Sequence, residues 1–231
     1  YLYFYFFYIQ MIIGIHGVQG SGKTSLVSKL EKKFGWNAVS IDDFYFPFEH
    51  IENIYRNSGE PLWSVRGNPG THDVKLILEC FKNFKDNKEF RVPIYDKYAK
   101  NAKGDRVGWK TIKPRDVLLF EGWCVGFEPV FNRTNVDNAL IEYSQINDFL
   151  DGLVILKPPY LNIVYEWREE AEEKIRNINA GMTKENVVKF VDLYMDSYNL
   201  YLPNLYNNFR KCILLVVELN SNRTVEKIEF I

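Results

Sequence analysis

The residues most capable of chemistry form a glycine-rich run near the start of the chain. Residues 17–24 read GVQGSGKT and match the phosphate-binding pattern G-x-x-x-x-G-K-[ST] at every fixed position. Glycines let backbone N–H groups approach a polyphosphate, and a helix that begins at the end of the loop directs its N-terminal amides at the anion. Lys23 can reach the β and γ phosphates, and the Thr24 hydroxyl can bind magnesium. The run predicts a site for a nucleoside triphosphate, with ATP and Mg²⁺ as the expected ligands.

Acidic side chains directly follow two later apolar runs. Asp42 and Asp43 follow residues 38–41, and Glu121 follows residues 116–120. Because ligands of open α/β sheets bind at the carboxyl ends of the strands, we expect these acids to lie near the phosphate loop. One carboxylate could orient or deprotonate an acceptor hydroxyl, and another could hold magnesium, usually through water. The structural alternative is a helix cap and a solvated acid.

Apolar runs alternate with helical patterns along the chain. The runs at 11–16, 38–41, 116–120, 152–156 and 212–219 predict five buried parallel strands. Helices are expected at 25–34, 73–84 (capped by Asp73), 161–177 and 183–202. The polar, basic, Gly/Pro-marked residues 91–106 read as an excursion from the core. The alternation predicts an α/β fold of the P-loop NTPase type, with a five-stranded parallel sheet between helices.

Composition narrows the choice of partners and compartment. The chain has 231 residues, 46% of them hydrophobic, and a net charge of −1, which suit one α/β domain without a basic field. We therefore expect no nucleic-acid polymer and no anionic membrane as partner, and the composition leaves the oligomeric state open. The three cysteines are far apart in the sequence, which indicates reduced thiols and a cytoplasmic location.

Residues 1–10 read YLYFYFFYIQ and contain no charge. The apolar run is shorter than the roughly 20 residues that a membrane-spanning helix needs. We interpret residues 1–10 as an extension outside the fold and residues 11–231 as a single domain. The alternative is a truncated membrane anchor.

Several longer motifs carry a family resemblance. After the phosphate loop, SIDDFY (40–45), PIYDKY (93–98) and LLFEGW (118–123) resemble the superfamily of uridine kinase, phosphoribulokinase and pantothenate kinase. RGNPGTHD (66–73) and FEGWCVGF (120–127) resemble the D-glycerate 3-kinase family of plants and its fungal ATP-binding relatives. The resemblance extends from about residue 12 to residue 205. It is weak at 132–151 and after 208, so the adenine pocket stays undefined.

The resemblance implies a role for each matching residue. Asp42 becomes the base, with Asp43 as the alternative, and Glu121 supports magnesium or substrate. The stretch 166–176 resembles the helical lid that brings arginine to the transferring phosphoryl group. The implied catalytic residues are Lys23, Asp42, Glu121 and Arg168, and the implied metal site is Thr24 with Glu121. The nucleotide-binding residues are Gly17, Gln19, Gly20, Ser21, Gly22, Lys23, Thr24 and Ser25. The acceptor-binding residues are Asp42, Asp43, Tyr45, Arg66, His72, Tyr95, Arg106 and Arg176.

The resemblance implies a magnesium-dependent kinase that converts D-glycerate to 3-phosphoglycerate with ATP. A small carboxylate favours a forked arginine partner, which Arg66, Arg91 or Arg106 could supply with Lys97, Lys100 or Lys103. A uridine- or pantothenate-type acceptor remains an alternative, because aromatic residues at 45–63 could stack on a base. An ATP-binding regulatory protein without an acceptor is the alternative of another class. The charged stretch 166–176 could also be a solvated helix face.

Overall fold

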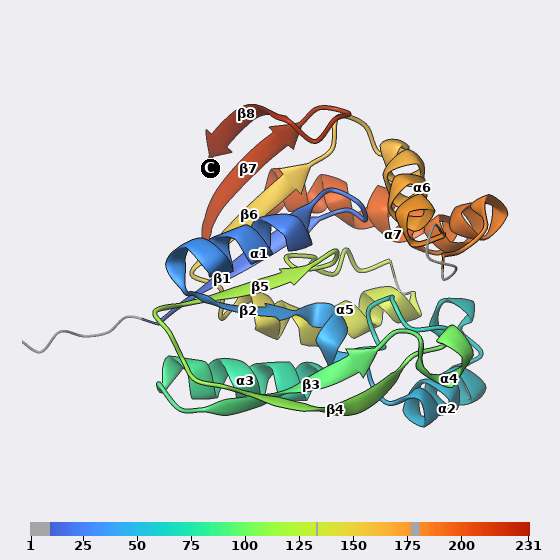
Figure 1. Ribbon diagram of the computed structural model, residues 1–231, viewed down its shortest axis with the longest axis horizontal. Coiled ribbons are helices and arrows are strands. Elements are labelled where there is room, and N and C mark those ends of the chain that lie inside the picture. Colours follow the sequence, from blue (N-terminus) through green and yellow to red (C-terminus); the bar gives the residue numbers. More distant parts are fainter. Residues whose placement is uncertain (1–9, 133, 177–180) are drawn as a thin grey trace, which may run out of the picture.

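The computed structural model describes residues 10–132, 134–176 and 181–231 and places a six-stranded sheet at the centre (Figure 1). The strands, in order across the sheet, are β2 (Asn37–Ser40), β5 (Val117–Gly122), β1 (Met11–Gly17), β6 (Gly152–Lys157), β7 (Ile213–Leu219) and β8 (Val225–Phe230). The first five are parallel, as predicted, and β8 pairs antiparallel with β7 at the edge. The predicted count of five strands was therefore one too low. The residues of β8 are mostly exposed and partly charged, so β8 lacks the apolar run of a buried strand.

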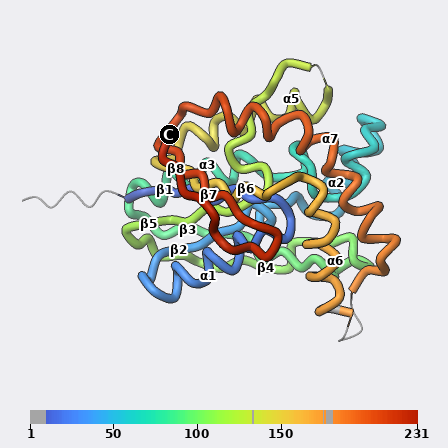
Figure 2. The backbone as a smooth tube through the Cα atoms, turned by 90° about the horizontal axis from the view of Figure 1, so that it is seen from above, coloured from blue at the N-terminus to red at the C-terminus, as the bar shows by residue number. Residues whose placement is uncertain are grey.

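Helices cover both faces of this sheet, as expected. They are α1 (Lys23–Phe34), α2 (Phe48–Ser58), α3 (Val74–Lys85), α4 (Ala99–Ala102), α5 (Asn135–Asn147), α6 (Ile163–Arg176) and α7 (Lys184–Asn208). Viewed from above, α1 lies on one side of the sheet, and α5 and α7 lie on the other (Figure 2). The sequence reading placed no helix at α4 or at α5.

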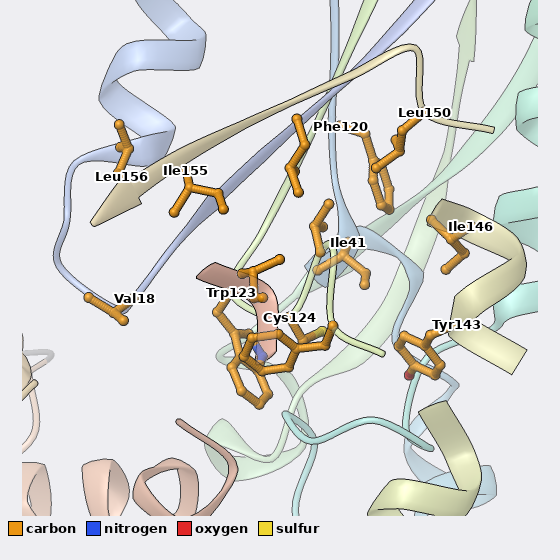
Figure 3. Packing of buried hydrophobic residues seen from close by; sticks show 14 of the residues in the cluster. Val18, Ile41, Phe120, Trp123, Cys124, Tyr143, Ile146, Leu150, Ile155 and Leu156 are labelled. Atoms are coloured by element: carbon orange, nitrogen blue, oxygen red, sulfur yellow. The ribbon is translucent and has the colours of Figure 1, made fainter. Parts of the chain in front are cut away.

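Two apolar clusters fill the space on either side of the sheet. The smaller cluster joins Ile15, Val27 and Leu119 beneath α1. The larger one contains Phe120 and Ile155 from the strands, with Trp123 and Cys124 just beyond β5 (Figure 3). The central strands β1 and β5 thus contribute to both clusters and are covered on both faces, which explains their continuous apolar runs in the sequence.

Residues 90–112 form a hairpin outside the central sheet. β3 (Phe90–Asp96) pairs antiparallel with β4 (Asp105–Ile112), and α3 packs against β3. The hairpin lies outside the central sheet, in keeping with the expected excursion from the core at 91–106, but the sequence reading assigned no strands there. Buried Phe90 and Val92 alternate with exposed Arg91, which is the pattern of a half-buried strand beneath basic composition. The turn of the hairpin presents residues 97–104 toward the phosphate loop.

Strand register brings the chemically capable residues together. Glu121 of β5 lies opposite Ser40 of β2 on one side and Ile15 of β1 on the other. Asp42 follows β2 by two residues, and Lys23 opens α1 just after β1. The acids and the phosphate loop therefore share the carboxyl edge of the sheet, as the sequence predicted.

The start of the chain can be described from residue 10. Gln10 is buried, and its side-chain amide donates to Asn87 beyond the end of α3, so this residue packs on the domain rather than extending from it. Residues 1–9 of the predicted extension lie outside the described residues. Within the described ranges, no helix is long and apolar enough to cross a membrane.

Asp73 caps α3, as predicted, and has a second partner. One carboxylate oxygen accepts the Leu76 N–H, and the other accepts from Arg106 Nη2, both at 3.1 Å. Asp73→Ala removes both bonds and should lower the free energy of unfolding by about 1–3 kcal/mol. Asp73→Asn keeps the cap and should lose less. Denaturant titration of both variants measures this, and equal losses would contradict a contribution from the cap.

Candidate active site

A cleft of about 700 Å³ opens at the carboxyl edge of the sheet. Its walls are Gln19, Gly20, Lys23, Thr24, Ser40, Asp42, Asp43, Tyr45, Val65, Arg66, Lys97, Tyr98, Ala102, Glu121, Gly122, Trp123, Arg168, Ala171, Glu172, Met182, Phe190, Leu193 and Tyr194. The phosphate loop and the acids thus face the turn of the β3–β4 hairpin and the helices α6 and α7. The cleft therefore has room for a donor and an acceptor side by side.

The phosphate loop has the backbone shape that its glycines permit. Gly20 and Gly22 have φ of 76° and 90°, in the left-handed region. A Cβ on Gly17 would lie 2.4 Å from Ser21 Oγ, and one on Gly20 would lie 2.5 Å from Trp167 Cβ. Ser21 is buried beneath the loop, and Ser25 lies in the first turn of α1. The Ser21 side chain and Trp167 thus pack against the loop, and the side of the loop that stays open faces the cleft.

Thr24 and Glu121 form a pair suited to a divalent cation. The Thr24 hydroxyl donates to Glu121 Oε1 at 2.9 Å, which leaves the threonine oxygen's lone pairs free for a metal. Glu121 is only 6% exposed, and burial raises the pKa of its carboxyl group, although Lys23 and the Thr24 bond oppose that change. Its Oε2 is buried without a hydrogen-bond partner among the described residues. Such an oxygen fits a magnesium-bound water, so these residues are compatible with the implied metal.

Of the two neighbouring acids, Asp42 makes more side-chain contacts than Asp43. Its Oδ2 accepts from Lys97 Nζ at 2.6 Å, and its Oδ1 accepts from the Tyr45 hydroxyl at 3.0 Å. Burial alone would raise the pKa of Asp42, but the Lys97 ammonium holds that pKa well below its usual range. Asp43 also lines the cleft, and it contacts Lys110 of β4 at 3.3 Å. The low pKa favours the ionised form of Asp42, and both of its oxygens are held at the wall of the cleft.

Arg66 donates most of its N–H groups to backbone carbonyls. Its Nη1 donates to the carbonyls of Ala102 and Lys103, and its Nη2 donates to the carbonyl of Lys97 at 3.2 Å. A guanidinium has five N–H groups, so these bonds leave two for a ligand. Arg66 therefore fixes the hairpin turn that carries Lys97, in addition to lining the cleft.

The rest of the RGNPGTHD segment anchors this arginine. The Trp123 indole donates to the Gly67 carbonyl at 3.1 Å, and the Asn68 amide donates to Leu193 of α7. A Cβ on Gly67 would lie 2.2 Å from the Tyr194 hydroxyl. The two most distinctive motifs thus pack on each other and on α7, as part of the scaffold around the cleft.

Four residues predicted to bind the acceptor do not line the cleft. His72 is buried, bonds Tyr143 through Nδ1 at 2.7 Å and has its pKa lowered to about 4 by burial, so it is neutral at physiological pH. Tyr95 packs edge-on against Tyr45. Arg106 donates to the Tyr45 carbonyl at 2.7 Å, and Arg176 pairs with Glu169. In this structure these four side chains support the fold around the cleft.

Arg168 of α6 does line the cleft, as the resemblance implies. It pairs with Glu172 one turn further along, and its guanidinium lies 4.7 Å from the centre of the Phe190 ring. Glu172 is 4% exposed and also accepts the Met182 N–H at 2.8 Å. The helix face is therefore not simply solvated, since Glu172 is buried and its bond to Met182 ties α6 to the residues before α7.

The sequence reading missed several residues of the site. Tyr194 and Phe190 were read only as the apolar face of a helix, yet they also line the cleft. Tyr198 was also read only as part of this apolar face, yet its hydroxyl accepts the Gln19 N–H at 3.2 Å. Lys97 was one of five cations in the basic run 91–106, and only its contact with Asp42 separates it from the others. Helical periodicity explained the aromatic residues equally well as core, so no local pattern could have found them.

Comparison with known proteins identifies the family. The model of the phosphoribulokinase / uridine kinase family matches residues 12–207. The chain belongs to this family. It is therefore a P-loop kinase, a phosphotransferase whose acceptor is an alcohol group, and it has the α/β fold that the sequence predicted.

Individual relatives sharpen this assignment. Chloroplastic D-glycerate 3-kinase of Arabidopsis thaliana is 36% identical over 85% of this chain, which spans about half (48%) of that protein. An uncharacterised kinase of Schizosaccharomyces pombe is 34% identical over 90% of the chain and 88% of its own length. The structure of D-glycerate 3-kinase from Cryptococcus neoformans superposes with a TM-score of 0.87 at 28% identity, covering 96% of this chain and 90% of that one.

The close approach of Gly20 to α6 predicts a sensitive position. In Gly20→Ala the new Cβ would meet Trp167 while the backbone keeps a positive φ, so the loop has to shift. We expect MgATP affinity to fall by at least on the order of 10-fold, measured by titration calorimetry. Gly35→Ala is the control, because it also has a positive φ (69°) but meets no atom within 4 Å. Normal affinity in Gly20→Ala would contradict the tight packing of the loop.

Proposed function

We propose that this kinase transfers the γ-phosphoryl group of ATP to D-glycerate, giving 3-phosphoglycerate, with Mg²⁺ as the metal. The observation that carries the proposal is an aspartate, Asp42, held between a lysine and a tyrosine in the cleft that the phosphate loop also lines. This arrangement suits an acceptor with both a hydroxyl and a negative charge. The similarity to two D-glycerate 3-kinases supports the choice among such acceptors.

On the donor side, the loop amides and Lys23 would bind the β and γ phosphates. Mg²⁺, held by the Thr24 hydroxyl and through water by Glu121, would neutralise charge on the same phosphates. Arg168 would approach the transferring group once its hold on Glu172 is exchanged for the phosphate. A guanidinium can bind phosphoryl oxygens in a bidentate way, which favours arginine at this position.

On the acceptor side, Asp42 would receive or orient the hydroxyl proton. An aspartate with a low pKa is a weak base, so it mainly aligns the hydroxyl and takes the proton as the O–P bond forms. The nearby Lys97 is the strongest candidate for the acceptor's carboxylate, because Arg66 has few donors left. In the resting site, Lys97 neutralises Asp42 instead.

The Lys97 contact suggests an exchange on acceptor binding. A carboxylate that draws the ammonium away would leave Asp42 free for the hydroxyl, so the base becomes available only when an acidic acceptor is present. Without an acceptor, Lys97 and the Tyr45 hydroxyl occupy both oxygens of Asp42, which disfavours activation of water and loss of ATP. The exchange links substrate choice to suppression of hydrolysis.

A nucleoside acceptor is the second candidate. Phe190 and Tyr194 line the cleft and could stack on a base, and the family includes uridine kinases. However, the Arg168 guanidinium already covers the Phe190 ring, and the cations near Asp42 suit an anion better than a neutral base.

A screen of acceptors separates these functions. The purified chain, with MgATP, is offered D-glycerate, uridine, pantothenate and ribulose 5-phosphate, and ADP release is followed by a coupled assay. We expect release with D-glycerate above the rate without acceptor, and mass spectrometry should identify 3-phosphoglycerate. Release with uridine and not with D-glycerate would reject the proposal.

Lys97→Met tests the acceptor half. Removal of the ammonium should raise the pKa of Asp42, since burial then dominates, and the acid limb of kcat/KM should move to higher pH. The KM for D-glycerate should rise on the order of 10-fold, while the KM for ATP stays the same.

Two further variants complete this test. Lys110→Met is the control, because it removes the similar contact to Asp43 and should leave the acid limb in place. Asp42→Asn should bind MgATP normally and reduce kcat on the order of 10²-fold or more. An unmoved acid limb in Lys97→Met, or full turnover in Asp42→Asn, would remove the proposed role of Asp42.

A further inference from the structure

The turn between β7 and β8 reaches back to the phosphate loop. This turn, residues 220–224, follows the last parallel strand and lies beyond the residues 12–207 that the family model matches. In Figure 1 it lies above α1, where the chain crosses from β7 to β8 beside the top of α6. It carries Arg223, a cation that neither the motifs nor the donor chemistry described above includes.

Arg223 contacts the phosphate loop and α6 together. Its Nε donates to the Gly20 carbonyl at 2.6 Å, and its Nη1 pairs with Glu170 at 2.7 Å. The guanidinium lies 4.9 Å from the centre of the Trp167 ring. One side chain thus links the loop to two residues of the helix that also carries Arg168.

The turn itself holds Arg223 in place. The Asn220 side chain accepts the N–H groups of Asn222 and Thr224, at 3.0 and 2.9 Å. The Trp167 indole donates to the Ser221 carbonyl at 2.9 Å, so the turn is tied to α6 independently of Arg223. The guanidinium is therefore positioned before any nucleotide arrives.

The bond to Gly20 controls the orientation of a peptide unit. Gly20 has a φ of 76°, and because it lacks a Cβ, its backbone rotates more readily than that of other residues. Arg223 holds the carbonyl oxygen toward the turn. If this peptide unit rotated, the oxygen could face the polyphosphate, where its partial negative charge would repel the phosphates. A fixed carbonyl keeps the inner surface of the loop lined with N–H donors.

We propose that Arg223 is a positioning residue for the nucleotide half of the site. It holds the Gly20 carbonyl away from the phosphates and connects the phosphate loop to α6. The proposal requires a P-loop that binds a polyphosphate, and it does not depend on which acceptor the kinase uses.

The test compares two ligands in Arg223→Ala. MgATP and inorganic tripolyphosphate with Mg²⁺ are titrated by calorimetry into the full chain, and circular dichroism checks the fold. We expect both ligands to bind on the order of 10-fold more weakly, the loss expected for one charge-assisted hydrogen bond. The KM for ATP should rise by a similar factor, with the KM for the acceptor unchanged. Lys227→Ala, which removes a β8 cation paired with Glu229, should behave as the parent chain.

The pattern of losses separates positioning from the other roles of an arginine. A loss for MgATP without a loss for tripolyphosphate would mean that Arg223 contacts the nucleoside, and it would overturn the proposal. Unchanged affinity for both ligands in a folded but less stable variant would mean a purely structural role, and it would overturn the proposal too. Should Arg223→Ala fail to fold, Glu170→Gln frees the guanidinium from its ionic partner and should weaken both ligands by the same smaller factor. A loss confined to one ligand there would again reject the idea.

Discussion

Negative charge is the constraint around which this site is organised. A kinase of this type brings a polyphosphate next to carboxylates that it needs for the metal and the acceptor, and like charges at short range are costly in a partly buried cleft. Here Asp42 and Glu121 lie on the same sheet edge as the loop that would bind the phosphates. Each acid therefore has a partner in advance: Lys97 for Asp42, and the Thr24 hydroxyl for Glu121.

The strands of the sheet position the acids, and segments outside the parallel strands supply most of the cations. Parallel strands in register fix Glu121 and the residues after β2 beside the loop, because neighbouring strands end at the same edge. Lys97 arrives from the turn of the β3–β4 hairpin, and Arg223 arrives from the turn of β7 and β8. In our proposals these two turns serve opposite halves of the site, Lys97 the acceptor side and Arg223 the nucleotide side. Because the sheet fixes the positions of the acids and the phosphate loop, residues in these turns can differ without a change in that arrangement.

The segments RGNPGTHD and FEGWCVGF contribute largely to the scaffold around the cleft. RGNPGTHD and FEGWCVGF meet through Trp123 and Gly67, and the buried His72 is held by Tyr143. Their backbone and aromatic contacts hold Arg66, which in turn holds the turn that carries Lys97. These contacts support the turn that carries Lys97, and His72 is part of that support rather than of the cleft wall.

The sequence by itself determined the local parts of this protein. The phosphate loop, the Asp73 cap and the buried parallel strands depend on residues close together in the chain. Residue spacing and backbone preference therefore predict them. The tertiary structure decided what depends on distant contacts. It gave Asp42 its contact with Lys97, joined His72 to Tyr143 and Arg106 to the Tyr45 carbonyl, and brought Arg223 to Gly20 across some two hundred residues. The partner of a cation depends on which strands and turns are adjacent in the fold. The composition along the chain does not show which of them are adjacent.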